Sequence, residues 1–547
     1  MTQRWMRVGA VSGLVLLGSI VFADVVWAAN QVRISDGLLQ GVTNADGSVL
    51  MFKDIPFAAP PLGELRWSAP QTPKKWSGIR LADKFGAPCL QTNVFGDIYF
   101  REAQPSEDCL NLDIWVPAKR RKNKLAVFLW FYGGGFVAGS ASEPRYDGEN
   151  LARKDIIVVN ANYRLGVFGF FSCPELTAES GHNASGNYGF LDQVAALRWV
   201  IQNIASFGGD PHNITIGGES AGSFSVSALM ASPLSKGLFQ KAIGESGAFF
   251  SSPTGKATLP LTPLTVSEQH GKKFAEALGA DSLADLRAMP AEKLLQAGAK
   301  PGQGFGPNLD GYFLPTDVLS VYEHGDQSHV PLLAGWNADE GQMFVLFSPQ
   351  KPTAQSFSEM ARQRFGSHAA EFLKLYPATT DQEAITSAEA LAGDDFTQFA
   401  TWKWLDMQRM MGDAPVYQYH FEEVPPTKPG ATVGSLPASE LGSRHAGEIE
   451  YVFDTLKLRP DLRWTADDFT LADAMSSYWA NFVKTGDPNG KGLPSWPQSN
   501  RKDGFQVMHL KGGDIHAGEA GVLLRGRYVF LDETQPATAS STAGGSQ

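Results

Sequence analysis

The sequence has little of what marks nucleic-acid-binding, metal-dependent or membrane-spanning proteins. Acidic residues outnumber basic ones, so the 547-residue chain carries a formal net charge of −11, which argues against a nucleic-acid partner. Its one dense basic run, residues 119–124, is interpreted as a solvated turn between two strands. The sequence contains no H-E-x-x-H motif and no paired Cys/His cluster, so it implies no metal and no organic cofactor.

A long membrane-spanning segment is also missing from the sequence. The apolar run at residues 8–23 is shorter than the roughly 20 residues that span a bilayer. Arg4 and Arg7 precede this run, and small residues end it near Ala28, a pattern typical of a secretory signal peptide over residues 1–28. We therefore expect a secreted or periplasmic protein without a stable membrane anchor, and an uncleaved anchor is the alternative.

Cysteine is scarce, with three residues in the whole chain. In an oxidising compartment an odd number favours one disulfide and one remaining thiol. Cys89 and Cys109 are the favoured pair because they enclose a short, polar, turn-rich loop. Closing such a loop stabilises the fold by about 3 kcal/mol in the chain-entropy model. Cys173 lies in an apolar stretch and is interpreted as a small buried hydrophobe.

The chain does contain a succession of short apolar runs, separated by segments in which apolar residues recur every three or four positions, as in a helix. Strands that alternate with helices predict an α/β fold with a mostly parallel central sheet covered by helices on both faces. An antiparallel hairpin is expected at residues 31–49, and the Pro-rich residues 52–70 are expected to wrap the surface. The runs interpreted as sheet strands are residues 112–116, 125–132, 156–159, 214–216, 242–244, 331–335 and 416–421, and residues 191–204 are interpreted as a helix.

Two long segments, residues 251–307 and 347–415, are helix-rich and contain few strand signals. We interpret them as insertions above the carboxyl ends of the strands, where open α/β sheets bind ligands. The expected organisation is a single domain over residues 30–531, with helical insertions over the site. A low-complexity tail at residues 532–547 is expected to be disordered.

The strongest chemical signal is G-x-S-x-G at residues 218–222, directly after a β-branched run and before a stretch of small residues. Strand, tight turn and helix form a nucleophile elbow, which presents a serine at the top of a sheet. Gly218 and Gly222 are expected because the turn leaves no room for a Cβ. About 0.4 such motifs are expected by chance in this composition, so an ordinary Gly-rich turn is the alternative.

A second glycine run, residues 133–135, follows the apolar run at residues 125–132. Successive glycines allow backbone N–H groups to converge on the oxyanion that forms when a serine attacks a carbonyl. A flexible glycine turn is the alternative interpretation. Serine attack also requires a histidine base and a carboxylate that orients it. In enzymes with a nucleophile elbow the chain order is Ser, then Asp or Glu, then His, so both partners are expected after residue 220.

Several motifs together resemble those of the type-B carboxylesterases, the α/β-hydrolase family that includes the cholinesterases. The motifs follow one another in the family's order and extend from about residue 52 to residue 497. They are FKDIPFAAPP at residues 52–61, EDCLNL at 107–112, YGGGF at 132–136, GGESAG at 217–222, NADEG at 337–341 and KTGDP at 484–488.

The resemblance implies a role for each matching residue. Ser220 is the implied nucleophile, Glu340 the triad acid and His445 the base. His420 and His324 are the spare histidines, for which surface or core roles are preferred. The remaining implied roles are oxyanion donors at Gly134, Gly135 and Ala221, an acidic neighbour of the nucleophile at Glu219, a supporting serine at Ser246, and the family's first disulfide at Cys89 and Cys109.

Two departures from the cholinesterases concern substrate recognition. The loop between the paired cysteines has Phe95, Tyr99 and Phe100 but no tryptophan, which speaks against a choline-type cation because tryptophan is the strongest cation–π partner. The segment matching the acyl pocket, residues 301–306, is poor in bulky side chains, which suggests a roomier acyl site.

The resemblance therefore implies a serine carboxylesterase that hydrolyses a small-molecule ester through an acyl-enzyme. One alternative is a hydrolase of a specialised aromatic or polymeric ester, an amide or a thioester. Another is a non-catalytic binding protein on the same scaffold. The triad residues alone do not separate the substrate classes.

Overall fold

The computed structural model describes residues 1–2, 30–96, 98–101, 104–119, 123–250, 259–433, 436–499, 505–519 and 521–534. Nearly all of the predicted signal peptide and most of the predicted tail therefore lie outside the described residues. Asp532 and Glu533 belong to a helix, so the prediction that the tail begins at residue 532 is wrong at these two positions. No helix within the described ranges is long and apolar enough to cross a bilayer.

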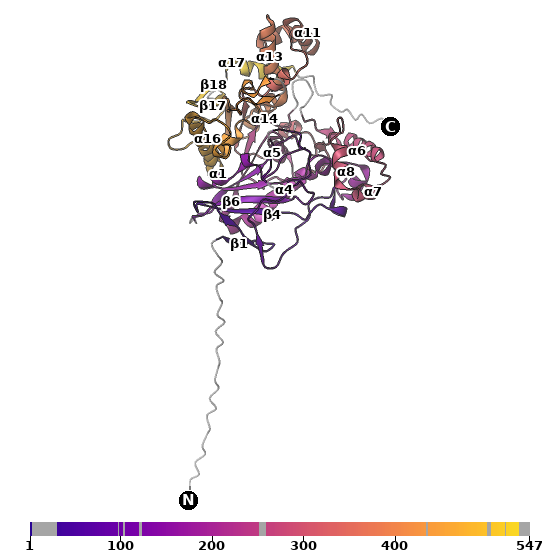
Figure 1. Cartoon of the computed structure of the whole chain (residues 1–547), viewed down its shortest axis with the longest axis vertical. Coiled ribbons are helices and arrows are strands. Elements are labelled where there is room, and N and C mark those ends of the chain that lie inside the picture. The colour runs from indigo at the N-terminus through magenta and orange to yellow at the C-terminus, as the bar shows by residue number, and fades with distance from the viewer. Residues whose placement is uncertain are drawn as a thin grey trace.

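An 11-stranded sheet forms the centre of the molecule, in the order β18-β17-β14-β13-β10-β9-β7-β8-β6-β4-β3 (Figure 1). The run from β17 to β8 is parallel, and antiparallel strands complete both edges. The expected α/β fold is confirmed. In chain order the strands are β3 (Val42–Thr43), β4 (Val49–Pro56), β6 (Asn111–Pro117), β7 (Leu125–Phe131), β8 (Ile157–Ala161), β9 (Gly209–Glu219), β10 (Lys241–Glu245), β13 (Leu332–Asn337), β14 (Val416–Phe421), β17 (Gln506–Lys511) and β18 (Asp514–Glu519).

Among the described residues, three small sheets lie outside the large one. The first contains the expected hairpin of β1 and β2, extended by β5. The second small sheet pairs β11 with β12, and the third pairs β15 with β16. The strands of the three small sheets are β1 (Gln31–Arg33), β2 (Leu38–Gln40), β5 (Ile79–Leu81), β11 (Thr262–Pro263), β12 (Asn308–Leu309), β15 (Thr432–Val433) and β16 (Leu436–Pro437).

Helices cover both faces of the large sheet. On one face α4, α5 and α14 pack on the strands, and on the other α1 and α16 do so. The α-helices are α1 (Glu149–Arg153), α2 (Gly166–Phe170), α3 (Pro174–Glu179), α4 (Tyr188–Asn203), α5 (Ala221–Ala231), α6 (Leu264–Leu278), α7 (Leu283–Ala288), α8 (Ala291–Gly298), α9 (Val318–Glu323), α10 (Gln342–Leu346), α11 (Ala354–Phe365), α12 (Ala369–Leu375), α13 (Asp381–Gly393), α14 (Phe399–Met411), α15 (Ile449–Val452), α16 (Ala466–Thr485) and α17 (Val522–Glu533).

Single turns and one irregular helix connect these elements. The 3₁₀ turns are η1 (Gly63–Leu65), η2 (Pro144–Tyr146), η3 (Ile204–Phe207), η4 (Gly366–His368), η6 (Ala438–Glu440) and η7 (Leu456–Leu458), and η5 (Asp394–Gln398) is a π-helix.

Burial explains why the central strands are continuous apolar runs. Every residue of β8 is buried, and so is every residue of β7 after Leu125, as expected for parallel strands covered on both faces. Neighbouring residues point to opposite faces, so Gly244 lies under Trp404 of α14 whereas Glu245 bonds Trp479 of α16.

One expectation about the N-terminal region is wrong. Residues 52–56 do not wrap the surface, because they complete β4, and Phe52 and Ile55 are buried in the core. The strand tolerates its irregular sequence because the pairing with β6 shifts register between Phe52 and Ile55, a bulge of the kind common toward sheet edges.

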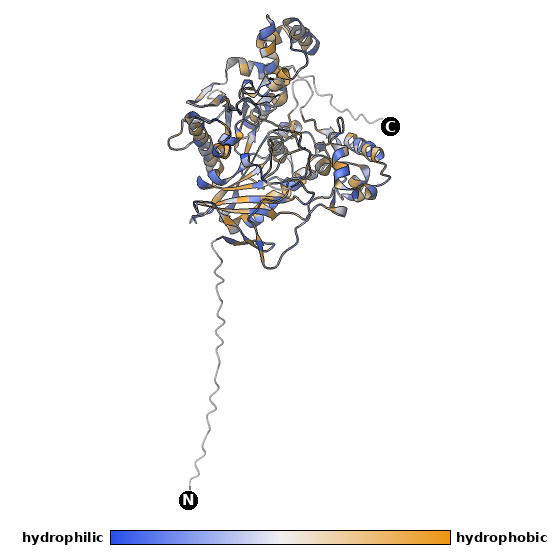
Figure 2. Cartoon of the chain, in the orientation of Figure 1, coloured by the Kyte–Doolittle hydropathy of each residue, from blue (hydrophilic) through white to orange (hydrophobic). Residues whose placement is uncertain are grey.

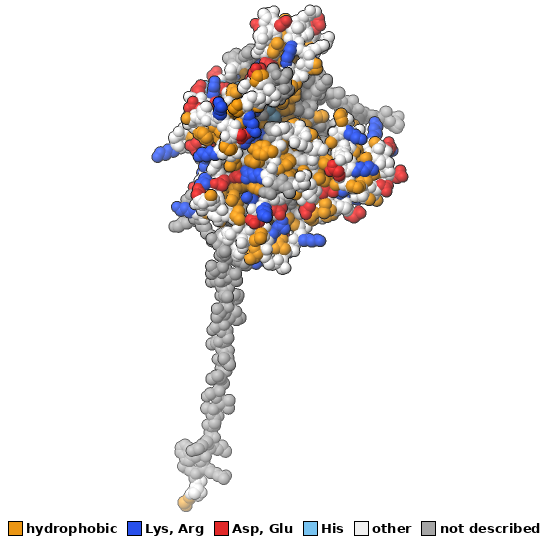
Figure 3. Space-filling view, in the orientation of Figure 1, with side chains coloured by type: hydrophobic (Ala, Val, Ile, Leu, Met, Phe, Trp, Pro, Cys, Tyr) orange, Lys and Arg blue, Asp and Glu red, His pale blue; other side chains and the backbone are white. Residues whose placement is uncertain are grey.

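The two predicted insertions are helical where the structure describes them. Helices α6–α8 form a group at one side of the molecule, and α11–α13 lie at its top (Figure 1). Helices α6–α8 carry both blue and orange residues in Figure 2, as amphipathic helices with one buried side do. Figure 3 shows charged side chains of both signs scattered over the visible face among apolar patches.

Cys89 and Cys109 form a disulfide with a Cα–Cα distance of 4.9 Å, and Cys173 is a buried free thiol. This is the pairing that the sequence favours. The bridge joins the two ends of the loop between Cys89 and Cys109, and β6 begins two residues after Cys109.

We predict that the double variant Cys89→Ser/Cys109→Ser loses about 3 kcal/mol of unfolding free energy, because the bridge restricts the unfolded chain. Urea titration of oxidised wild type, reduced wild type and the variant measures the loss. Cys173→Ala is the control and should not respond to reduction differently from wild type. Recovery of Cys173 in a disulfide-linked peptide would contradict the pairing.

Candidate active site

Ser220 lies at the tip of a sharp turn between β9 and α5. Its φ of +52° is in the left-handed region, which side chains other than glycine rarely adopt. A Cβ on Gly218 would lie 2.5 Å from the carbonyl carbon of Gly222, and one on Gly222 would lie 2.0 Å from the carbonyl oxygen of Phe131. Both glycines are therefore required by close backbone contact, as predicted for an elbow.

His445 lies between Ser220 and Glu340. Its Nε2 is 2.9 Å from the Ser220 hydroxyl oxygen, and its Nδ1 is 3.2 Å from a carboxylate oxygen of Glu340. The three residues come from the β9–α5 turn, the loop after β13 and the loop before α15. The structure thus brings together the three side chains that the resemblance selected.

The loop that carries His445 is held by the loop that carries Glu340. The Ser443 N–H donates to Asp339 at 2.8 Å, and the Asn337 side chain donates to the Arg444 carbonyl at 2.8 Å. Because these bonds hold the two residues that precede His445, they fix the imidazole relative to the end of β13.

The carboxylate of Glu340 is 1% exposed and accepts four hydrogen bonds. One oxygen accepts from the Asn337 N–H at 2.9 Å and from the Ser246 hydroxyl, and the other accepts from Thr397 and His445. A buried charge requires such partners, because an unpaired one would be neutralised by protonation. Ser246 supports Glu340 directly.

The glycine run after β7 borders Ser220. A Cβ on Gly133 would lie 3.0 Å from the Cβ of Ser220. Gly134 and Gly135 have φ of +99° and +62°, so the backbone here turns in a way that favours glycine. The N–H of Ala221 is the first of α5 and has no intrahelical acceptor.

The disulfide loop reaches the same glycine run. Gln91 exchanges two hydrogen bonds of 2.8 Å with the backbone of Gly139. The ring of Phe95 lies 4.0 Å from where Gly135 would carry a Cβ. Phe95 and Tyr99 are 40% and 37% exposed, so this loop contributes aromatic surface beside the site.

The charges around His445 favour its protonated form. Burial alone disfavours the imidazolium, but the negative charges of Glu219 and then of Glu340 outweigh it and raise the pKa of His445 above its usual value. A Glu219 oxygen is 3.3 Å from His445 Nε2. Burial raises the pKa of Glu219, so the two groups titrate as a pair. For Glu340 burial alone would raise the pKa, but the charge of His445 and the side-chain hydrogen bonds from His445, Ser246 and Thr397 outweigh it and lower the pKa.

Two further buried carboxyl groups were not singled out by sequence reasoning. Glu245 accepts from the Trp479 indole at 2.7 Å, and Glu448 accepts from the Asn337 amide at 2.5 Å. Burial is the main cause that raises the pKa of each. The charge of Glu448 adds to the rise at Glu245, and the charge of Glu340 adds to the rise at Glu448. Only their burial distinguishes them from solvated glutamates.

Sequence reasoning also missed the π-helix η5. It contains Thr397, which donates to Glu340, and Phe396, whose ring makes an edge contact with His445 at 4.8 Å between centroids. Phe344 of α10 packs on Phe396 at 5.0 Å. No periodicity signals one extra residue in a helical turn, although such bulges are frequent at functional sites.

The spare histidines lie elsewhere. His324 is exposed at the end of α9, with Nδ1 2.7 Å from the Ser320 carbonyl, and His420 of β14 faces Glu422. In the predicted acyl-pocket segment the bulky side chain, Phe305, packs into the core against Phe274.

The comparisons with known proteins agree with this geometry. A model of the carboxylesterase family matches residues 28–515. The chain belongs to the carboxylesterase family.

Relatives and solved structures match over most of their length. Fumonisin B1 esterase of Sphingopyxis macrogoltabida is 36% identical over 88% of this chain and 86% of its own length. A medium-chain fatty acyl-CoA hydrolase precursor of Anas platyrhynchos is 35% identical over 86% of each. A solved PNB esterase structure covers 93% of this chain and 100% of its own, with a TM-score of 0.75 and 30% identity. This member of the carboxylesterase family is a carboxylic ester hydrolase with the α/β-hydrolase fold.

We predict that activity falls on the acid side with a midpoint above about 6.5, the unperturbed pKa of histidine. The raised pKa of His445 means that its neutral form, which accepts a proton, is lost at a higher pH. In Glu219→Gln the largest of the charges that raise this pKa is gone, so the acid limb of kcat/KM moves to lower pH.

The control is Glu440→Gln, which removes an exposed carboxylate in η6. It should leave the profile in place. An acid limb that stays at the wild-type position in Glu219→Gln would contradict the coupling between Glu219 and His445.

Proposed function

We propose that Ser220, His445 and Glu340 act as a catalytic triad that hydrolyses carboxylic esters through an acyl-enzyme. The single observation that carries this proposal is the pair of hydrogen bonds of His445, to Ser220 on one side and to Glu340 on the other. Glu340 keeps Nδ1 protonated, so Nε2 is left to accept the proton of the serine.

The proposed reaction uses these groups twice. The Ser220 oxygen attacks the carbonyl carbon while its proton moves to His445 Nε2. The C–O bond to the alcohol then breaks, and the alcohol leaves with that proton. Water attacks the acyl group through the same base, and the acid departs as Ser220 regains its proton.

The negative oxygen of each tetrahedral intermediate requires preorganised donors. We assign this role to the backbone N–H groups of Gly134, Gly135 and Ala221, because the glycine run borders Ser220 and the first N–H of α5 adjoins it. Losing one such donor costs about 10²–10³ in kcat.

The surroundings of His445 favour a substrate with an apolar part. The ring of Phe396 contacts the imidazole, and the ring of Phe344 packs on Phe396. Three apolar side chains here are 38–47% exposed: Met343 and Phe344 in α10, and Phe347 directly after it. We propose an uncharged, lipophilic ester, and the absence of a tryptophan in the disulfide loop speaks against a choline-type cation.

A thioester substrate is the second candidate. The relative named as a medium-chain fatty acyl-CoA hydrolase favours it, because the same nucleophile, base and donors serve both reactions. Comparing kcat/KM for a thioester and an oxygen ester with the same medium-length acyl group tests it. Preference for the oxygen ester by tenfold or more would reject this candidate.

We further propose that residues 1–28 direct export and are removed. The disulfide supports this proposal, since disulfides persist mainly in oxidising compartments. The intact mass of protein collected from the periplasm or the medium should correspond to a chain that begins after Ala28.

We predict that Ser220→Ala reduces hydrolysis of a small aryl ester by at least about 10³-fold, because no other hydroxyl takes over the attack. Steady-state rates and covalent labelling with an organophosphate measure it. Ser223→Ala, which changes a buried serine in the helix that follows Ser220, is the control for folding. Labelling at a residue other than Ser220, or substantial activity in Ser220→Ala, would refute the triad.

A further inference from the structure

Three histidines form a row across the edge of the large sheet, away from the triad. His420 of β14 is the direct partner of His509 on β17, and His509 is the direct partner of His516 on β18. Residues opposite one another on paired strands share a face of the sheet. The rings of His509 and His516 stack with centroids 4.9 Å apart.

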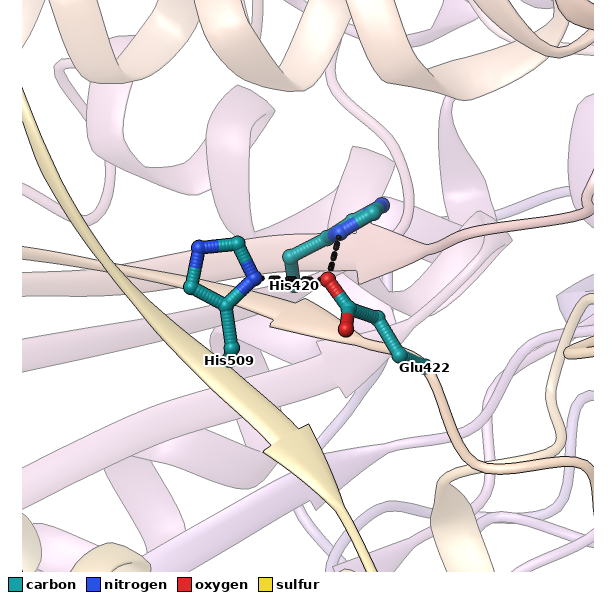
Figure 4. A group of neighbouring side chains, drawn as sticks. All are labelled: His420, Glu422 and His509. Atoms are coloured by element: carbon teal, nitrogen blue, oxygen red, sulfur yellow. Dashed lines mark hydrogen bonds and ion pairs between the residues drawn. The ribbon is translucent and has the colours of Figure 1, made fainter. Parts of the chain in front are cut away.

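A carboxylate completes this group. Glu422 follows β14 and places one oxygen 2.8 Å from Nδ1 of His420 and 2.6 Å from Nδ1 of His509 (Figure 4). The two imidazoles thus approach the same carboxylate oxygen from different strands. One ligand atom from each of the three residues lies within 4.8 Å of the others.

Two imidazole nitrogens and one carboxylate oxygen are a ligand set that zinc uses in proteins. Zinc bonds to these atoms are about 2.0–2.2 Å long, so tetrahedral ligands lie about 3.3 Å apart. The observed contacts, 2.8 and 2.6 Å, have the lengths of hydrogen bonds and are shorter than this. Opening them by about half an ångström is within the reach of side-chain rotation.

We propose that His420, Glu422 and His509 form a binding site for a divalent transition metal ion, for which Zn²⁺ is the best-fitting species. The ion replaces the shared protons, and its fourth position is open to water. His516 stacks on His509 and bonds Asp514 at 2.9 Å, which holds the His509 ring in place.

Such an ion would join the edge of the sheet to its interior. β14 and β17 are paired through three residues, Tyr419, His420 and Phe421, on the β14 side, so an ion between His420 and His509 reinforces the pairing. The Phe421 carbonyl accepts from Ser443 at 2.9 Å, two residues before His445. The proposed site therefore stabilises β14, to which the loop that carries His445 is hydrogen-bonded, without contacting the reacting atoms.

The test is titration of the full chain, free of any histidine tag and stripped with a chelator, with ZnCl₂ by isothermal calorimetry. We expect one ion bound per chain and a rise in Tm with Zn²⁺, because an ion that binds only the folded state stabilises it. Glu422→Gln and His509→Gln should each weaken binding by at least about tenfold. His212→Gln, which changes an exposed histidine at the start of β9, should bind as wild type.

Two measurements keep the result specific. Each variant must hydrolyse a small aryl ester at the wild-type rate before metal is added, which separates loss of the site from loss of the fold and from failure of the triad. With Co²⁺ as the probe, wild type should develop the visible bands of a four-coordinate ion, and Glu422→Gln should not. Absence of binding in wild type, or equal binding by both ligand variants and His212→Gln, would overturn the proposal.

Discussion

The buried carboxylate of Glu340 is the constraint on which the site depends. A charge that is 1% exposed persists only if its lone pairs are occupied. Its donors come from four parts of the chain: the end of β13, the residue after β10, the π-helix η5 and the loop before α15. Satisfying one carboxylate therefore requires two neighbouring strands, an insertion and the loop that carries His445 to meet at a single point.

The parallel sheet makes this meeting possible. β9, β10 and β13 are consecutive neighbours in register, so Glu219 lies beside Glu245, and Glu245 lies beside Gly335. Their carboxyl ends emerge at one edge, where Ser220, Ser246 and Glu340 follow within a few residues of each strand. Open α/β sheets bind ligands at this edge for the same reason.

Features set by residues close together in the sequence could be predicted, whereas features set by contacts between distant segments could not. The elbow was readable because Gly218 and Gly222 are dictated by local crowding, and β7 was readable because burial on both faces removes polar residues. Residues 52–56 were misjudged because prolines nearby suggested a surface segment, whereas a register shift accommodates them in β4. Position in a motif pointed to Glu340 and His445, and their contact required the fold.

Thr397 and the buried carboxyl groups illustrate what local patterns omit. Thr397 reaches Glu340 across 57 residues of sequence, through a π-helix that no periodicity signals. Glu245 and Glu448 look like ordinary glutamates until the sheet buries them around His445.

The same dependence on assembled strands distinguishes the two proposed sites from one another. In the sequence His420 was a spare histidine, since nothing indicated that β17 would pair with β14 in a register that sets it opposite His509. The proposed triad lies where strands end and loops converge, an arrangement that suits a substrate and a base that moves a proton. The row of histidines is built within paired strands, where side chains are held by the ladder itself. A rigid ladder suits an ion that holds strands together, and converging loops suit chemistry, so the sheet edge and the strand ends serve different purposes.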